Sequence, residues 1–385
     1  MVNIGTNMKK ILLIPDSFKG TMSSSEICDI MEKSIRKTYP SAEIISIPVA
    51  DGGEGSVDAF LSAVGGEKKT VTVKGPYFED MEAFYGIIDN GKTAIIEMAA
   101  CAGLPLVGDN KDPRETTTYG VGQLIQAAIK DGCKKIIMGL GGSATNDAGT
   151  GVAAALGVKF TNENGVEFIP VGGTLKEIAH IDMSGIDQSL NSIEFVTMCD
   201  IDNPLYGETG AAYIFGPQKG ATPEIVVELD NGLRHIAEVI KTDLLKDVSE
   251  LKGAGAAGGM GGGMVAFFGS QLQMGIDTVL DTVNFDKLVE NADIVFSGEG
   301  KIDSQSIRGK VVIGVAKHTQ KANIPLVAIV GDIGDDIEAA YDKGVTAIFS
   351  INRVAVDFKI AKTRAKDDLA LTMDNLMKFI HRIKQ

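Results

Sequence analysis

The stretch "ADIVFSG" (residues 292–298) is a short apolar run that ends in small residues, and two similar runs follow it, "IPLVAIVG" (324–331) and "VTAIFSI" (345–351). Stretches with helical spacing separate these runs, so the pattern predicts βαβ units in a parallel sheet with helices on both faces. The N-terminus alternates in the same way, with apolar runs at 9–15 and 43–49 around a predicted helix. Each end alone supplies too few strands for a stable sheet, so we expect both ends to form one domain.

The predicted fold class is α/β, with two α/β domains. Residues 8–74 and 286–385 are expected to form a discontinuous Rossmann-like parallel-sheet domain and residues 75–285 an inserted α/β domain, with the active site in the cleft between them. A length of 385 residues suits two such cores. Residues 1–7 are expected to be a disordered leader or to precede an alternative start at Met8.

The glycine-rich stretch "KGAGAAGGMGGGMVAFFG" (residues 252–269) resembles a flexible linker at first sight. The residues between its glycines are Ala, Met, Val and Phe, whereas flexible linkers carry Ser, Glu or Lys. We therefore expect an ordered, close-packed turn at the domain junction.

Composition excludes several classes of function. A formal net charge of −14 argues against nucleic acid or an anionic membrane as the main partner, since either needs a basic face. The four cysteines form no CxxC pair and are expected to be reduced, as in a cytoplasmic protein. The four histidines are not clustered, which leaves little material for a zinc site or a histidine-based triad. Whether the chain forms a homo-oligomer stays open.

The stretch "GIIDNGKT" (residues 86–93) fits the phosphate-loop pattern G-x-x-x-x-G-K-[ST]. A phosphate loop must follow a buried strand and begin a helix, but here β-branched residues follow the lysine. Asn90-Gly91 is a strong hairpin signal, so we expect strands at 84–88 and 93–98, with Lys92 on a solvated turn. Any nucleotide site should lie elsewhere.

Five apolar runs are each followed at once by glycines, carboxylates or cations, in "IPDSFKG", "PVADGGEGS", "MGLGGSATND", "MCDIDNPLYG" and "FSGEGKIDSQS". In open α/β sheets, ligands bind at the carboxyl ends of the strands, so these junctions are the candidate site. The third is the best phosphate-loop candidate, because glycines and hydroxyl or amide side chains follow its strand and a helix of small residues comes next. The alternative is a tight strand-to-helix connection with ordinary capping residues.

Asp200 and Asp202 alternate on an extended segment, so both carboxylates are able to face one Mg²⁺ or a substrate hydroxyl. Helix caps or an Asx-turn before Pro204 are the alternative reading. Asp51 and Glu54 in "ADGGEG" are ambiguous in the same way. Basic residues beside glycines suit phosphates and carboxylates, and the candidates are Lys19, Lys219, Lys301, Arg308 and Lys310.

These motifs, in this order, resemble the bacterial glycerate kinases of the type that yields 2-phosphoglycerate. The stretches that carry the resemblance are "DSFKG", "ADGGEG", "GLGGSATNDAGTG", "CDIDNPL", "FGPQKGA", "GAGAAGGMGGG" and "SGEGKIDSQS". The resemblance runs from about Lys9 to the C-terminal helix. It implies ATP-dependent phosphorylation of D-glycerate to 2-phosphoglycerate, less readily to 3-phosphoglycerate, with Mg²⁺ as cofactor.

The roles of individual residues are our own inference from what phosphoryl transfer requires. ATP phosphates are assigned to Gly141, Gly142, Ser143, Thr145 and Asn146. Asp200 or Asp202 is assigned to Mg²⁺, and Asp200 also to the hydroxyl proton. Substrate and catalytic roles are assigned to Asp16, Ser17, Lys19, Asp51, Lys301, Asp303 and Arg308.

Two other classes of protein use similar loops. A nucleotide- or sugar-phosphate-binding regulator would need no cluster of acidic residues, so the aspartates argue against it. A nicotinamide oxidoreductase would need an acidic residue at the end of a second buried strand about 20 residues after its glycines. Glu163 and Glu167 lie near that distance, but in the turn-rich stretch "TNENGVEF".

Overall fold

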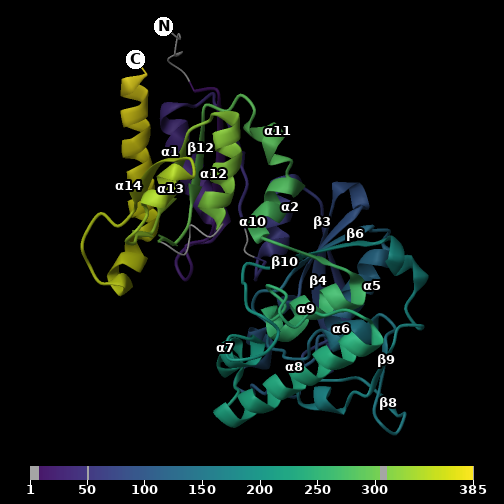
Figure 1. Ribbon diagram of the computed structural model, residues 1–385. Coiled ribbons are helices and arrows are strands. Elements are labelled where there is room, and N and C mark those ends of the chain that lie inside the picture. Colours follow the sequence, from purple (N-terminus) through teal and green to yellow (C-terminus); the bar gives the residue numbers. More distant parts are fainter. Residues whose placement is uncertain (1–7, 50–51, 304–309, 385) are drawn as a thin grey trace. The chain divides into compact units, whose positions relative to one another are not determined.

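The computed structural model describes residues 8–49, 52–303 and 310–384. They form two compact units (Figure 1). The terminal unit comprises the described residues of Met1–Ala50 and Ile276–Gln385, and the inserted unit comprises those of Asp51–Gly275. Both units combine helices with largely parallel sheets, which confirms the predicted α/β class.

The terminal unit is built on a five-stranded, fully parallel sheet. Its strands are β1 (Lys10–Pro15), β2 (Glu43–Ser46), β12 (Ile294–Gly298), β14 (Leu326–Val330) and β16 (Val345–Ser350). Their spatial order is β2-β1-β12-β14-β16. This is the doubly wound order 2-1-3-4-5, which places a ligand-binding switch point where β1 and β12 lie next to each other.

Helices cover both faces of this sheet (Figure 1). The helices of this unit are α1 (Ser24–Thr38), α10 (Gly275–Thr282), α11 (Phe285–Val289), α12 (Val311–Ala322), α13 (Glu338–Asp342) and α14 (Phe358–Ile383), of which α10 and α11 lie against α12. Ile11 and Leu13 share a core with α1 and α14. Side chains alternate along a strand, so Leu12 and Ile14 face the other side, where α12 packs on β1 and β12.

The inserted unit has a six-stranded mixed sheet in the order β11-β10-β6-β5-β4-β3. Its strands are β3 (Glu67–Lys74), β4 (Asp80–Ile88), β5 (Thr93–Glu97), β6 (Lys135–Gly139), β10 (Glu194–Met198) and β11 (Gln271–Gln273). β3, β4 and β5 pair antiparallel, and the others pair parallel. A small antiparallel sheet is formed by β7 (Lys159–Thr161), β8 (Glu167–Phe168) and β9 (His180–Asp182).

The described residues of the inserted unit form two hydrophobic cores. One lies between the mixed sheet and helix α5, and the other surrounds helix α8 and the small sheet. The helices are α2 (Ser56–Val64), α3 (Ala99–Ala102), α4 (Leu104–Val107), α5 (Tyr119–Lys130), α6 (Thr150–Ala155), α7 (Ala211–Phe215), α8 (Pro223–Asp243) and α9 (Ala256–Phe268). Short 3₁₀ turns are η1 (Asp89–Gly91), η2 (Gly172–Glu177), η3 (Gln188–Ser192) and η4 (Pro217–Lys219).

The hairpin predicted for "GIIDNGKT" is present. β4 and β5 pair antiparallel, with Ile88 opposite Thr93, and η1 makes the turn between them. Lys92 is exposed on this turn, so the hairpin interpretation is confirmed.

The two units are divided at residues 50/51 and 275/276, whereas the sequence predicted boundaries at 74/75 and 285/286. β3 pairs with β4 over its whole length, and α2 packs on β4 and β5, so the chain from Gly52 onward belongs with the inserted unit. Residues 276–285 belong with the terminal unit instead. The β3–β4 pairing is antiparallel and local in sequence, which the alternation of strands and helices at the two ends did not reveal.

The glycine-rich stretch is ordered, as predicted, but it is helix α9 inside the inserted unit rather than a turn at the domain junction. Ala257, Gly258 and Gly259 depart from helical backbone angles and bend its first turn. Nearly all of its residues are buried, so it is part of the core of its unit.

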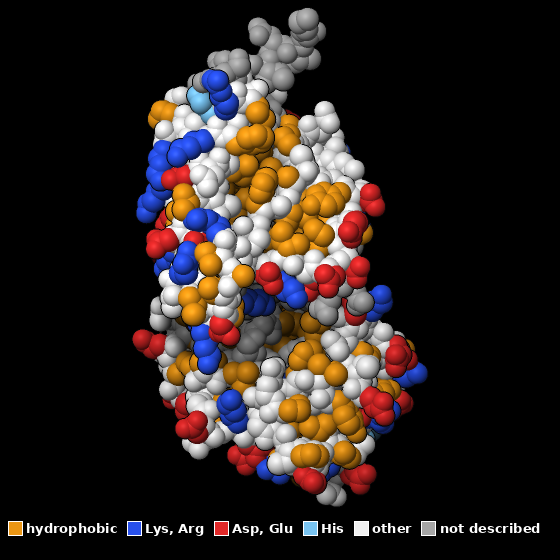
Figure 2. Space-filling view, turned by 90° about the vertical axis from the view of Figure 1, so that its left-hand side faces the viewer, with side chains coloured by type: hydrophobic (Ala, Val, Ile, Leu, Met, Phe, Trp, Pro, Cys, Tyr) orange, Lys and Arg blue, Asp and Glu red, His pale blue; other side chains and the backbone are white. Residues whose placement is uncertain are grey.

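Basic and acidic side chains lie among each other on the face of the molecule seen in Figure 2. Hydrophobic side chains are exposed there too, and the start of α14 contributes Phe358 and Ile360 to the exposed apolar residues of the chain. Within the described ranges, no helix is both long and apolar enough to cross a membrane.

Candidate active site

Three of the five candidate junctions meet in the inserted unit. The Gly52 carbonyl accepts a hydrogen bond from the Gly141 N–H at 2.9 Å. A Cβ on Gly139 would lie 2.3 Å from the Gly52 oxygen, and a Cβ on Gly52 would lie 3.2 Å from Cβ of Met198. Only glycine permits backbones to pass this closely, so the glycines of "ADGGEG" and "GLGGSA" bring two loops against the end of β10.

Glu97 fixes the first of these loops. Its buried carboxylate, at the end of β5, accepts the N–H groups of Gly55 and Val57 at 3.2 and 2.6 Å, at the start of α2. Burial raises the pKa of Glu97, and these two hydrogen bonds act in the opposite direction. Sequence reasoning assigned no role to Glu97, although a carboxylate directly after the apolar run "TAII" is a signal that a buried partner exists.

The predicted phosphate loop connects β6 to α6 and covers residues 140–149. Ser143 is 6% exposed, and Thr145 and Asn146 are fully buried. The Thr145 hydroxyl and both polar atoms of the Asn146 side chain are buried without a hydrogen-bond partner in the described part of the chain. Buried polar groups normally have partners, so this loop has the unmet hydrogen-bonding capacity of a binding site.

Asp147, in the same loop, was missed by the sequence reasoning. Its fully buried carboxylate accepts four hydrogen bonds, from N–H and Oγ1 of Thr118 (both 2.8 Å) and from the N–H groups of Gly149 (3.1 Å) and Gly151 (3.3 Å). Burial raises the pKa of Asp147, and the four donors oppose this effect. Asp147 therefore closes the loop on itself and ties it to the segment that precedes α5.

Lys219 adds a cation to this loop. It ends η4, it is 2% exposed, and its Nζ donates to the Ser143 hydroxyl at 2.8 Å and to the Thr145 carbonyl at 2.6 Å. Burial lowers the pKa of Lys219 to about 7, and the negative charge of Asp147 acts in the opposite direction. The sequence marked Lys219 as a candidate cation but did not place it beside Ser143.

Helix α9 supports the loop from behind. The Gly258 carbonyl accepts the Ala148 N–H at 3.0 Å. A Cβ on Gly258 would lie 2.0 Å from the Thr145 oxygen, and a Cβ on Gly263 would lie 2.1 Å from the Ala148 oxygen. The glycines of α9 are thus needed for a close backbone approach to the loop.

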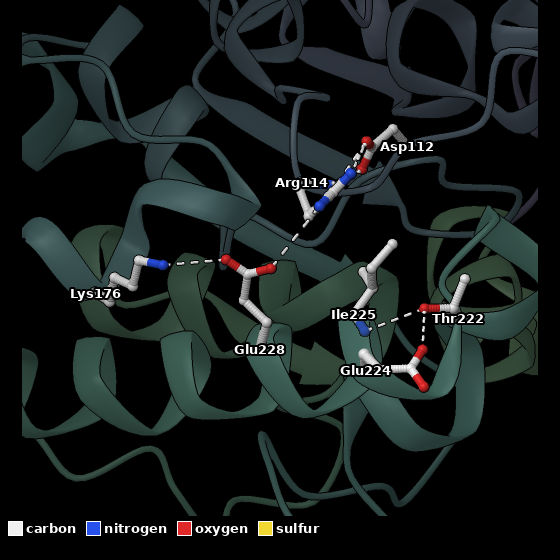
Figure 3. A network of polar contacts seen from close by, with 7 residues as sticks. All are labelled: Asp112, Arg114, Lys176, Thr222, Glu224, Ile225 and Glu228. Carbon is white, nitrogen blue, oxygen red and sulfur yellow. Dashed lines mark hydrogen bonds and ion pairs between the residues drawn. The ribbon is translucent and has the colours of Figure 1, made fainter.

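A chain of ionic contacts organises the segment before α5 (Figure 3). Arg114 donates to Asp112 through Nη2 at 2.6 Å, its Nη1 lies 4.0 Å from Glu228 of α8, and Glu228 also accepts from Lys176 of η2 at 3.1 Å. Two residues beyond Arg114, Thr116 donates through Oγ1 to the Ala144 carbonyl at 3.0 Å. The network is partly exposed, so it orders this segment more than it stabilises the fold.

Asp200 and Asp202 follow β10 and are both exposed. Asp200 Oδ1 accepts the Gly275 N–H at 2.7 Å. Among the described residues, no group of three or more His, Cys, Asp and Glu is placed to hold a metal ion. Mg²⁺ commonly takes one or two carboxylates and completes its shell with water and substrate phosphate, so this pair fits Mg²⁺ in the chemistry of its donors.

The other two junctions meet at the switch point of the terminal unit, between β1 and β12. The Asp16 N–H donates to the Gly298 carbonyl at 2.8 Å, and a Cβ on Gly300 would lie 3.5 Å from the Lys19 nitrogen. Mutual hydrogen bonds between Phe18 and Met22, at 2.9 and 3.0 Å, close a tight turn that exposes Lys19.

The same edge of the terminal unit presents further predicted residues. Ser17 N–H donates to Asp16 Oδ1 at 2.6 Å, and Lys301 lies 3.7 Å from Asp303. Asp16, Ser17 and Lys19 lie in the loop after β1, whereas Lys301 begins the short strand β13 (Lys301–Ile302) and Asp303 directly follows it. All five follow the ends of β1 and β12, the neighbouring strands that the sequence pattern predicted. Asp51 and Arg308 lie outside the described residues, as do residues 1–7.

The model of the glycerate kinase family matches residues 11–381. A glycerate kinase of Halalkalibacterium halodurans is 46% identical, over 89% of this chain and 91% of the relative. A glycerate 2-kinase of Escherichia coli K12 is 47% identical, over 89% of this chain and 90% of the relative. A crystal structure from Salmonella typhimurium LT2, described as glycerate kinase 2, has a TM-score of 0.87 and 40% identity, and the match covers 98% of this chain and 100% of that one.

Two α/β units with glycine-rich strand-end loops, together with these relatives, define the protein as a kinase, an enzyme that transfers a phosphoryl group. The chain belongs to the glycerate kinase family. The resemblance found in the motifs is thereby confirmed, and membership of a kinase family implies the use of ATP.

Proposed function

We propose that the protein transfers the γ-phosphoryl group of ATP to the 2-hydroxyl of D-glycerate, which yields 2-phosphoglycerate and ADP. The observation that carries the proposal is the loop of residues 140–149, which Lys219 contacts and which has buried polar groups with no partner among the described residues. Both features suit a phosphate, in a chain 47% identical to a protein named glycerate 2-kinase. Transfer at the 3-hydroxyl is the less favoured product, because that relative carries the 2-kinase name.

The loop supports the assignment of ATP phosphates to Gly141, Gly142 and Ser143. A positive φ of 74° at Gly142 turns the backbone sharply directly before Ser143. Thr145 and Asn146, also assigned to phosphate, are fully buried, so they would contact a ligand only after the loop shifts. α6 is too short to serve as an anion site by itself, which leaves the loop and Lys219 as the proposed phosphate-binding groups.

Asp200 and Asp202 would hold Mg²⁺, which when bound supplies positive charge to the phosphate oxygens and orients them for transfer. Asp200 is also proposed to accept the proton of the attacking hydroxyl, since a positioned carboxylate is the usual base in such reactions. Its Oδ1 is already oriented by the Gly275 N–H.

In the terminal unit, Lys19 and Lys301 are proposed to bind the carboxylate of glycerate or the transferred phosphate. Asp16, Ser17 and Asp303 would hold the hydroxyl groups through hydrogen bonds. The exposed ammonium of Lys301 lies close to Asp303 at 3.7 Å, so each orients the other.

The test is an ADP-release assay with D-glycerate, with 3-hydroxypropionate, which lacks the 2-hydroxyl, and with D-lactate, which lacks the 3-hydroxyl. We expect release with D-glycerate and none above background with 3-hydroxypropionate. Phosphorus NMR then identifies the product, because phosphate at C2 couples to one proton and gives a doublet, whereas phosphate at C3 couples to two and gives a triplet. A triplet would refute the 2-hydroxyl assignment.

A further inference from the structure

Lys219 is a buried cation held at two points by one loop. Its Nζ donates to the Ser143 hydroxyl and to the Thr145 carbonyl, at 2.8 and 2.6 Å. The negative charge of Asp147, in the same loop, also acts on it. Lys219 comes from η4, 74 residues or more from either partner in the sequence. Lys219 therefore holds the loop of residues 140–149 from a separate segment of the chain.

The contact also sets the direction of the Ser143 hydroxyl. An ammonium group only donates hydrogen bonds, so the Ser143 oxygen must be the acceptor. The hydroxyl proton of Ser143 then points away from Lys219 and is available to an acceptor elsewhere. Ser143 is 6% exposed, whereas its neighbour Thr145 is fully buried, so Ser143 reaches the surface of the loop.

A second observation shows that the loop is prepared for a ligand. Thr145 Oγ1 and the Asn146 amide, both fully buried, have no hydrogen-bond partner in the part of the chain that the structure describes. They lie two and three residues after Ser143, the residue that Lys219 orients. Unpaired buried polar groups destabilise a fold unless a ligand or water satisfies them, so these residues are better explained by binding than by packing.

We propose that Lys219 is the positioning residue of the ATP site: its ammonium directs the Ser143 hydroxyl toward a phosphate oxygen of ATP and fixes the loop through the Thr145 carbonyl. This inference rests on the proposed function, since it takes ATP as the ligand of the loop. Lys219 acts through Ser143, and Ser143 makes the contact with phosphate.

A purely structural lysine would behave differently. A buried lysine that only supports the fold does so through its hydrogen bonds, and its removal leaves buried acceptors unpaired, which lowers stability. If Lys219 only supported the fold, Lys219→Met would change thermal stability and affect the two substrates alike. If it positions Ser143, the variant keeps its fold and weakens nucleotide binding alone.

The experiment measures binding of the non-hydrolysable analogue AMP-PNP with Mg²⁺ by calorimetry, and the KM values for ATP and D-glycerate. The proteins are the wild type, K219M, S143A and the double variant. K246M is the matched control, because Lys246 also donates to a carbonyl, that of Ala266 at 2.6 Å, away from the loop. Thermal unfolding is recorded for each protein.

We expect K219M and S143A each to weaken AMP-PNP binding and to raise the KM for ATP about 10- to 100-fold. This is the effect expected when a hydrogen bond to a charged group is lost. The KM for D-glycerate should change little. The double variant should be no weaker than the weaker single variant, because both changes remove the same contact. K246M should bind as the wild type does.

Unchanged AMP-PNP binding in K219M would overturn the inference, as would additive losses in the double variant or a parallel rise in both KM values with lowered stability. These results leave the proposed function intact if the wild type still releases ADP with D-glycerate. A wild type that binds AMP-PNP through Lys219 but releases no ADP with D-glycerate would overturn the proposed function and retain the inference. A wild type that binds no nucleotide would overturn both.

Discussion

Lys219 connects a single ionisation to ligand affinity. Its pKa of about 7 means that the ammonium is present below neutrality and is lost above it. A neutral amine can accept a hydrogen bond, so above pH 7 the Ser143 hydroxyl can turn toward Lys219 and away from phosphate. Binding of an anion beside Lys219 favours the charged form, so binding above pH 7 must take up a proton.

The expected result is that wild-type affinity for AMP-PNP falls between pH 7 and 9, by up to about tenfold per pH unit. Calorimetry in buffers of different ionisation enthalpy should detect the proton uptake. Among the ionisable groups that the structure describes, Asp147 is the one whose charge acts on Lys219, and it is unchanged in K219M. An identical pH slope in K219M would contradict this origin.

The catalytic residues and the hairpin lysine should separate clearly in mutagenesis. Asp200→Ala is expected to lower kcat by about 10²- to 10⁴-fold, since it removes the proposed base, and Lys19→Ala should lower kcat strongly as well. Both residues are exposed, so thermal unfolding should change little. Lys92→Ala is the control, because Lys92 lies on the solvated turn of the hairpin. A large loss of activity in Lys92→Ala would contradict the assignment of this turn.

Single residues also show where sequence reasoning reached its limit. Asn90-Gly91 predicts its hairpin because the turn depends only on its own backbone angles. Lys219 and Asp147 were not assigned roles because their partners are distant in sequence and because a lysine or aspartate in a loop is usually solvated. Glu97 was missed for the same reason.

At the scale of elements, α9 offers a matched pair of glycines. Gly258 and Gly269 have similar positive φ angles, +69° and +64°, but a Cβ on Gly258 would lie 2.0 Å from the Thr145 oxygen, and a Cβ on Gly269 would meet nothing within 4 Å. Gly269→Ala should destabilise by about 1–2 kcal/mol through its backbone angle alone. Gly258→Ala should cost roughly 1–3 kcal/mol more, and it should also weaken AMP-PNP binding.

Urea unfolding and calorimetry of the two variants measure this difference. Equal free energies of unfolding, or normal AMP-PNP binding in Gly258→Ala, would show that α9 does not shape the loop.

Helices α1 and α14 are joined by an ion pair that acid should break. Glu26 of α1 lies 2.5 Å from Lys366 of α14 and also accepts the Ser23 N–H at 2.9 Å. Lys366 is the largest cause that lowers the pKa of Glu26 to about 2 from its ordinary value of 4.5. A lowered pKa means that the folded state favours the ionised Glu26 carboxylate. Ionised Glu26 therefore stabilises the fold above pH 4.5, and this contribution is lost as the pH falls toward 2.

The pair is exposed, so its contribution should stay below about 1 kcal/mol. Urea unfolding at pH 6 should show Glu26→Gln less stable than the wild type, and the difference should shrink at pH 3. If the difference in the free energy of unfolding between Glu26→Gln and the wild type stays constant with pH, the loss of stability comes from capping of α1 and not from the ion pair.

At the scale of the whole molecule, the inserted unit is continuous in sequence and contains two cores of its own. We expect residues 52–275, expressed alone, to fold and to unfold cooperatively, as monitored by circular dichroism. Residues 8–49 alone should be unfolded, because β1 lies between β2 and β12 and needs a strand from the other end of the chain. A disordered 52–275 fragment would contradict this division.

The alternation of strands and helices at the two ends was sufficient to predict the discontinuous sheet, because βαβ units leave a strong hydrophobic pattern. The boundary at residue 74 was wrong because the pattern of β3 does not reveal whether it pairs with a strand of the first or the second sheet. The strand ends of the candidate site were predicted from the same rule that places ligands at carboxyl edges, whereas the contacts within each loop depend on packing that no local pattern encodes.

The position of β1 has a consequence for synthesis on the ribosome. About 280 residues separate the end of β1 from the start of β12, its neighbour in the sheet. At a translation rate of about 5–20 residues per second, β1 emerges roughly 15–55 s before β12 does. Throughout that interval the apolar N-terminal segment lacks its partner strand, and the inserted unit is complete only near its end, when residue 275 has been made. This N-terminal segment is where chaperones should bind.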